Sequence, residues 1–194
     1  MTGVQTCALP ISTHNNHHWL VLILCWFTEG SPEHHFLCLS FQPEEDQGSL
    51  RIPQHAILAN LKIQEKHGIL YDGLYSAHVQ VGLLKHLTSR QKLMGTRGIL
   101  RFTPSEPLAS LIQEWDQSDS RLMSEKKDNM LIHYPKELCL KIYRTPEEGP
   151  NPGQEILQHL SQRAGLDFVP EFAGDMIYSA FGEEPMTLGI FRSY

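Results

Sequence analysis

The sequence predicts an α+β fold built mainly from antiparallel sheets. Most apolar residues lie in short runs of strand length, which are separated by turns rich in Gly, Pro and Asp. Two stretches, 76–93 and 152–165, instead repeat apolar residues at helical spacing. With 41% apolar residues among 194, the chain is long enough for one full domain or for two small subdomains that share an interface.

The first twelve residues, MTGVQTCALPIS, look like the translation of a sequencing adapter, and we expect residues 1–12 to be non-native. A signal peptide is the alternative interpretation. However, no basic region precedes the apolar run and no small-residue cleavage site follows it. The fold is therefore predicted from residue 13 onward.

Residues 13–108 are predicted to form a cap subdomain, a curved antiparallel sheet with one main helix. The apolar runs 19–27 and 34–41 flank the turn TEGSPE, which indicates a hairpin. A short strand is expected within 53–74. The segment LYDGLY at its end could form a platform for a sugar ring, or a plain turn with buried tyrosine rings.

The main helix of the cap is predicted over 76–93, where Val79, Leu83, Leu84 and Leu87 share one face. Gly95 is the candidate for its C-cap. The strand RGILRFTP and a Pro-rich loop follow. We place the subdomain boundary near Leu108.

Residues 109–194 are predicted to form a second subdomain in the order strand, strand, helix, strand, strand. MLIHY and LCLKIYR are expected to pair as a hairpin around PKE. Alternation in the second strand turns Leu138, Leu140 and Ile142 to one face, and Cys139, Lys141 and Tyr143 to the other.

The predicted helix of this subdomain has a well-defined start. Asn151 can cap it, Pro152 suits the first helical position, and Glu155 lies in the first turn, where the helix dipole favours an anion. We expect the helix to run to Ala164 and Gly165. Its buried stripe is expected to be Ile156, Leu157 and Leu160.

Composition excludes several classes of partner. A net charge of −6 and a pI of about 6.0 indicate neither nucleic acid nor an anionic membrane surface. The longest apolar run, 19–27, is about half the ~20 residues needed to span a bilayer as a helix.

Four cysteines without metal-like spacing fit a reducing cytoplasm. Histidines 14, 17, 18, 34 and 35 could be read as zinc ligands, but no second shell of carboxylates is evident and we expect no metal site.

A lysine on the second strand and a glutamate on the following helix match the layout of a protein-kinase-like N-lobe. In that layout the lysine ammonium holds the ATP phosphates, and the glutamate fixes the position of the lysine. From the pattern alone, a solvated surface ion pair is the more common explanation of a lysine and a glutamate so placed, as such pairs occur in many α+β domains. The kinase interpretation predicts that the two side chains lie within salt-bridge reach.

The chain resembles bacterial maltokinases along most of its length. Members of this family carry a Ser/Asn-rich stretch, a hairpin ending in Leu-Lys-Leu-Phe-Arg, and then Gly-x-Asn-Pro-x-x-Glu-Ile. The corresponding stretches here read LCLKIYR and GPNPGQEI. FTEGSPEHHFLCLSF and GILYDGLYS are similar to the N-terminal cap of the same family. These matches, in the right order, cover nearly everything after residue 18.

The resemblance implies an enzyme of trehalose and glycogen metabolism that uses ATP and Mg²⁺ to phosphorylate maltose to maltose 1-phosphate. It implies that Lys141 contacts the ATP phosphates, that Glu155 positions Lys141, and that Asn129 lies in the loop that covers the phosphates. In this loop KKDNML replaces most of the small hydroxyl and amide residues of the family pattern.

Phosphoryl transfer also needs a catalytic Asp, a nearby Asn and a metal-binding Asp. No His-Arg-Asp or His-Gly-Asp motif occurs in the 194 residues. We therefore expect no catalytic residue and no metal ligand in this chain. These residues are expected in an absent C-lobe, so the fragment alone should be inactive. Its partners would be that C-lobe and, in fusion proteins, a trehalose synthase domain.

Two alternatives stay open. The chain could be a non-catalytic cap or interaction module of a trehalose synthase-type fusion. It could also be the N-lobe of another small-molecule kinase of the aminoglycoside-phosphotransferase-like superfamily, with a different acceptor. The Lys141 and Glu155 pair separates the first alternative from the kinases, because a pure interaction module has no need of it.

Overall fold

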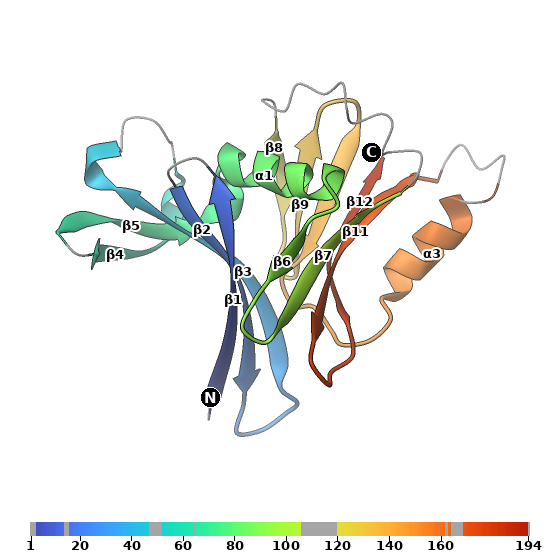
Figure 1. Cartoon of the computed structure of the whole chain (residues 1–194), viewed down its shortest axis with the longest axis horizontal. Helices are drawn as coiled ribbons and strands as arrows, with labels where there is room; N and C mark the ends of the chain where they lie inside the picture. The colour runs from blue at the N-terminus through green and yellow to red at the C-terminus, as the bar shows by residue number, and fades with distance from the viewer. Residues whose placement is uncertain are drawn as a thin grey trace.

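The computed structural model describes residues 3–13, 16–46, 52–63, 65–105, 120–161, 163 and 169–193. Within these residues the chain forms two antiparallel sheets and two α-helices, an α+β arrangement as the sequence predicts. Figure 1 shows the two sheets side by side, with helix α1 lying across the top between them and helix α3 at the outer side of the second sheet. No helix in these ranges is long and apolar enough to cross a membrane.

The first sheet has five strands in the order β1-β2-β3-β5-β4. Their bounds are β1 Gly3–Thr13, β2 Asn16–Trp26, β3 Glu33–Pro43, β4 Ile57–Ile63 and β5 Lys66–Asp72. The hairpin predicted from the runs 19–27 and 34–41 is confirmed as β2 and β3. The stretch predicted to hold one short strand holds two strands, β4 and β5.

The segment that we set aside as adapter-like forms an edge strand of this sheet. Strand β1 pairs with β2 along its whole length, from Gly3 opposite Trp26 to Thr13 opposite Asn16. Cys7 and Leu9 of β1 are buried in the common core. Apolar residues at alternate positions allow this segment to cover the β2 edge, whatever its origin.

Helix α1, Ala77–Thr88, buries the predicted apolar face formed by Val79, Leu83, Leu84 and Leu87. The described residues of this half also include the short 3₁₀ helices η1 Glu44–Asp46, η2 Gln54–Ala56 and η3 Gly73–Tyr75. The prediction that Gly95 caps α1 is wrong. The helix ends at Thr88 with Ser89 as its C-cap. Gly95 instead closes a tight hairpin through a backbone hydrogen bond from its N–H to the Gly98 carbonyl, 2.9 Å.

The second sheet has seven strands in the order β6-β7-β11-β12-β10-β9-β8. Their bounds are β6 Lys92–Met94, β7 Gly98–Pro104, β8 Arg121–Glu125, β9 Asn129–Tyr134, β10 Leu138–Tyr143, β11 Phe172–Ala180 and β12 Met186–Ser193. The predicted order from residue 130 onward, strand, strand, helix, strand, strand, is present as β9, β10, α3, β11 and β12. Strands β6 and β7 precede the proposed boundary yet join this second sheet through β11. Leu108 itself lies outside the described residues.

Helix α3, Pro152–Ser161, begins as predicted, because the Asn151 side-chain oxygen accepts a hydrogen bond from the Gln154 N–H at 3.0 Å. The predicted buried stripe is wrong for Ile156, which is 59% exposed, whereas Leu157 and Leu160 are half-buried. The buried residue of the helix is Gln154. The predicted end at Ala164 and Gly165 lies outside the described residues.

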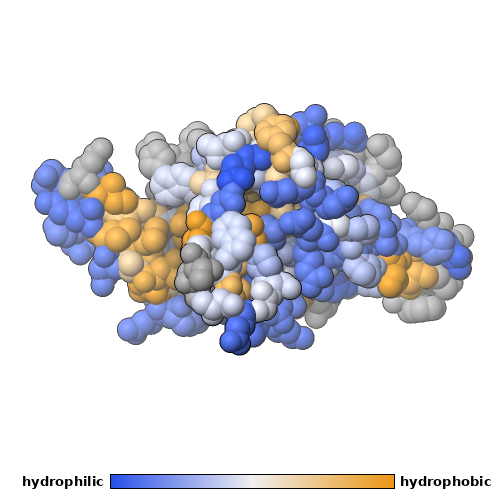
Figure 2. Space-filling view, turned by 90° about the horizontal axis from the view of Figure 1, so that it is seen from below, coloured by the Kyte–Doolittle hydropathy of each residue, from blue (hydrophilic) through white to orange (hydrophobic). Residues whose placement is uncertain are grey.

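One hydrophobic core joins the two sheets and α1, and it includes Leu20, Phe36, Leu84, Phe102, Leu140 and Phe191. The core therefore lies on the face of the second sheet opposite Lys141, since Leu140 points inward and the side chains of a strand alternate. Figure 2 shows an apolar area at the left end of the molecule, where β4 and β5 lie in Figure 1. Strand β4 exposes Leu58, Leu61 and Ile63.

Candidate functional site

A cleft of about 1200 Å³ opens where the first sheet meets the second. Its walls come from the start of β3, the turn between β8 and β9, and the segment after β10. Acidic side chains outnumber basic ones on this lining. The acidic ones are Glu33, Asp72, Glu125, Asp128, Glu147 and Glu148, and the basic ones are Lys126, Lys127 and Arg144. This excess of negative charge disfavours a triphosphate in the cleft.

Arg144 joins the two sheets at the floor of the cleft. Its guanidinium forms an ion pair with the Asp72 carboxylate, and the two side chains are only 12% and 11% exposed. The same guanidinium donates to the Phe36 carbonyl at 3.5 Å. The Arg144 backbone accepts from the Phe36 N–H and donates to the Asp128 carbonyl, both at 2.8 Å. One residue thus ties β3, the end of β5 and the β8–β9 turn together.

Asp72 also shapes the segment LYDGLY. Its second carboxylate oxygen accepts from the Leu74 N–H at 3.1 Å and caps the 3₁₀ helix η3. The Tyr71 side chain is buried at 1% exposure. In the structure this segment is a capped turn with the Tyr71 ring buried, as the turn interpretation predicts.

Cys38 lies beside this ion pair, completely buried. Burial raises the pKa of its thiol far above the ordinary value, Asp72 raises it further, and Arg144 opposes the shift. A thiol in this environment stays protonated and packs as a small apolar group. The structure therefore gives Cys38 no nucleophilic role.

A second link between the sheets runs through Tyr75, which follows Asp72 by three residues. Its hydroxyl donates to the Glu125 carboxylate on β8, and the His55 ring nitrogen lies 3.1 Å from the same hydroxyl. Burial, and after it the Glu125 carboxylate, raise the pKa of Tyr75. The tyrosine remains a neutral donor that holds η3 against β8.

Lys141 and Asn129, two of the residues predicted to contact ATP, lie on the same face of the second sheet. Asn129 is directly opposite Tyr143 in the β9–β10 register, and Tyr143 is two residues from Lys141. The half-buried Lys141 ammonium lies over the Tyr143 ring, 4.6 Å from its centroid. Neither Lys141 nor Asn129 lines the acidic cleft. A ligand that they share would therefore bind on the face of the sheet that carries α3.

Helix α3 packs against this same face through Gln154. Its amide nitrogen donates to Asp175 at 2.8 Å, and its amide oxygen accepts from the Thr187 hydroxyl at 2.7 Å. Asp175 is opposite Ile190, which is in turn opposite Lys141, so all three side chains share one cross-strand row. Burial raises the pKa of Asp175 to about 6, while the Thr103 hydroxyl opposes the shift.

The predicted ion pair between Lys141 and Glu155 is not formed in the described part of the chain. Glu155 is exposed, whereas its neighbour Gln154 faces the sheet. Adjacent residues of an α-helix differ by about 100° around its axis, so burial of Gln154 turns Glu155 away. The structure brings Lys141 and Asn129 to one face but leaves Glu155 on the solvent side of α3.

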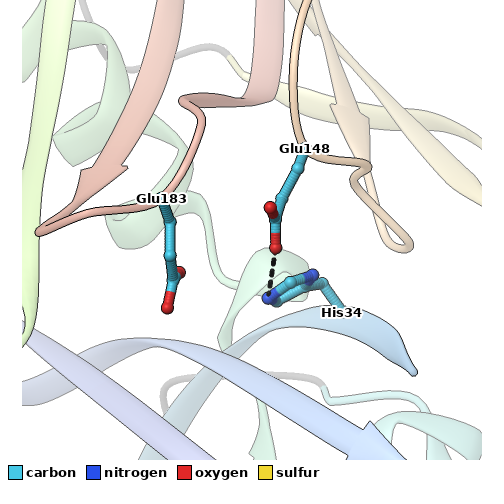
Figure 3. A group of neighbouring side chains, drawn as sticks. All are labelled: His34, Glu148 and Glu183. Atoms are coloured by element: carbon cyan, nitrogen blue, oxygen red, sulfur yellow. Dashed lines mark ion pairs between the residues drawn. The ribbon is translucent and has the colours of Figure 1, made fainter.

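Sequence reasoning missed a group of side chains at the rim of the cleft. Figure 3 shows His34 on β3, with Glu148 and Glu183 approaching it from two loops of the second half. The three offer ligand atoms that lie within 4.8 Å of one another. His34 was considered as a zinc ligand from the sequence, but the two glutamates lie more than 100 residues further on and carry no local signal.

No protein-family model matches this chain. A comparison with curated proteins also finds no match.

Proposed function

We propose that this chain is the ATP-binding part of a sugar kinase similar to maltokinases. The observation that carries the proposal is the position of Lys141, an ammonium group in the middle of a central strand, on the face that helix α3 covers. Among the described residues its ammonium forms no ion pair, and it lies over the ring of Tyr143, 4.6 Å from the centroid. A cation without a carboxylate partner is available to an anionic ligand.

The surroundings of Lys141 support a phosphate ligand. Its face of the sheet also holds Asn129 and Tyr143, whose amide and hydroxyl groups can donate hydrogen bonds. The order strand, strand, helix, strand, strand supports the proposal, because the kinase N-lobe in which such a lysine holds ATP phosphates has the same order along the chain. Mg²⁺ and the catalytic Asp and Asn belong, in this proposal, to a C-lobe of the parent protein, which would also bind maltose.

In the structure Glu155 is exposed, and its neighbour Gln154 occupies the inward position through hydrogen bonds to Asp175 and Thr187. The proposal therefore rests on Lys141 and Asn129, and it gives Glu155 no part in holding Lys141.

Calorimetric titration of the purified chain with ATP tests the proposal. Lys141→Met removes the ammonium but keeps most of the apolar stem. We expect it to weaken ATP binding by about 10- to 100-fold, because a hydrogen bond to a charged group contributes about 1.5–3 kcal/mol. Lys127→Met in the acidic cleft is the matched control and should bind like the wild type. Equal affinities for ATP in all three proteins would refute the role of Lys141.

The second candidate is a non-catalytic interaction module, and the exposed position of Glu155 favours it. A module of this kind needs no pairing of Lys141 with Glu155 and no ATP site. The same titration separates the two functions, since the module would show no ATP binding even at millimolar concentration. If ATP binds through Lys141 but the parent protein does not accept maltose, another kinase of the aminoglycoside-phosphotransferase-like superfamily is indicated instead.

A further inference from the structure

His34, Glu148 and Glu183 converge from three separate elements at the rim of the cleft. His34 belongs to β3 in the first sheet, Glu148 to the segment between β10 and α3, and Glu183 to the turn between β11 and β12. The His34 Nε2 atom lies 3.9 Å from the Glu148 Oε1 atom. Figure 3 shows the Glu148 carboxylate at the imidazole and the Glu183 side chain extending toward the same space.

The backbone holds the two glutamates near each other. Glu148 forms an isolated β-bridge with Met186, and the Gly149 N–H donates to the Pro185 carbonyl at 2.9 Å. These contacts attach the segment after β10 to the turn that carries Glu183. Two carboxylates are therefore kept together by main-chain contacts, although their mutual repulsion opposes the arrangement.

One imidazole and two carboxylates form a donor set that suits a divalent transition-metal ion. Histidine nitrogen and glutamate oxygen bind Zn²⁺ at about 2.0–2.2 Å, so the ligand atoms of a tetrahedral site lie about 3.3 Å apart. In the structure the three ligand atoms lie within 4.8 Å of one another, which is close to that spacing. Glu148 is 45% exposed and Glu183 is also exposed, so their side chains can close the difference by rotation.

We propose that His34, Glu148 and Glu183 bind one Zn²⁺ ion, which links the first sheet to two loops of the second sheet. The His34 side chain is 11% exposed and presents Nε2 toward both glutamates, so the imidazole gives the site a fixed anchor. Three protein ligands leave a fourth position for water. The imidazole favours Zn²⁺ over Mg²⁺ and Ca²⁺, which prefer all-oxygen ligand sets. This site is independent of the proposed ATP function.

Zn²⁺ titration of the chelator-treated full chain, followed by calorimetry, tests the proposal. We expect one strong site in the wild type and a loss of affinity of about 100-fold or more in His34→Ala, because removal of even an outer partner of a ligand costs 10–100-fold. His35→Ala is the matched control. His35 neighbours His34 in sequence, but its Nε2 atom lies 3.5 Å from Glu33 and away from the site, so its loss should leave the affinity unchanged.

Thermal unfolding provides a second readout. Free Zn²⁺ at one hundred times its Kd should raise the Tm of the wild type by about 5–10 °C, and an equal concentration of Mg²⁺ should not. Glu183→Gln, in an exposed turn, keeps the test valid if His34→Ala does not fold. Zn²⁺ affinity that survives in both His34→Ala and Glu183→Gln would assign the binding to other histidines and overturn the proposal.

Discussion

Removal of the Arg144 guanidinium should destabilise the protein strongly, because this group neutralises a carboxylate at the junction of the two sheets. Arg144→Met keeps the apolar stem and leaves Asp72, 11% exposed, without its cation. Loss of one partner from a buried ion pair costs about 3–5 kcal/mol. That is a large share of the ~5–15 kcal/mol by which a typical domain is stable.

A double-mutant cycle measured by urea unfolding separates the ion pair from the packing of each side chain. Asp72→Asn removes the negative charge while its amide oxygen can still accept from the Leu74 N–H and cap η3. The double variant should be more stable than the sum of the single losses predicts. We expect a coupling free energy of about 1–3 kcal/mol, which is typical of directly contacting groups.

The wild type and all three variants must show the same dependence of unfolding free energy on urea for this comparison to hold. Exposed ion pairs contribute up to about 1 kcal/mol. If Arg144→Met lowers the unfolding free energy by less than this amount, the ion pair does not hold the sheets together. A coupling free energy near zero would lead to the same conclusion.

Three further predictions follow from single contacts. The pKa of Asp175 is about 6 in the folded protein and about 3.8 in the unfolded chain, so the folded state holds the proton more tightly. The contribution of Asp175 to stability therefore falls as the pH rises from about 4 to 6, by roughly 3 kcal/mol in total. Urea unfolding at pH 4 and 7 should show that Asp175→Asn removes this loss, and an unchanged pH dependence in the variant would contradict it. Asn151→Ala removes the cap of α3 and should cost about 1 kcal/mol with faster amide exchange in the first helical turn, whereas Asn151→Ser should restore most of it. The chain alone should form no maltose 1-phosphate from ATP and maltose, because its sequence lacks the His-Arg-Asp type of motif; product detected by mass spectrometry from the purified chain would refute this.

Local sequence signals predicted the elements whose cause is itself local. The β2–β3 and β9–β10 hairpins follow from two apolar runs around a polar turn, and both formed. Asn151 before Pro152 predicted the start of α3 correctly, since the capping hydrogen bond spans only three residues. The prediction that Gly95 caps α1 failed because apolar residues continue at helical spacing to residue 93. The helix itself ends at Thr88, and strand β6 begins at Lys92.

The side of α3 that faces the sheet could not be predicted from the pattern of its own residues. Its apolar residues predicted that Ile156 faces the sheet, and the motif predicted that Glu155 approaches Lys141. In the structure a polar residue, Gln154, faces inward because Asp175 and Thr187 offer it partners on the sheet. These partners lie 21 and 33 residues away in sequence. The rotation of the helix about its own axis was therefore decided by tertiary contacts and not by its own residues.

The sequence by itself determined the α+β class, the order of the elements after residue 130 and the position of Lys141 in a strand with one apolar face. Periodicity and turn chemistry act over a few residues, and a single chain displays them fully. The tertiary structure alone decided that β6 and β7 join the second sheet, that Arg144 meets Asp72 and that His34 meets two glutamates. Such contacts form because burial of one shared core brings together segments that are distant in sequence. The spacing of neighbouring residues does not reveal which distant segments will meet.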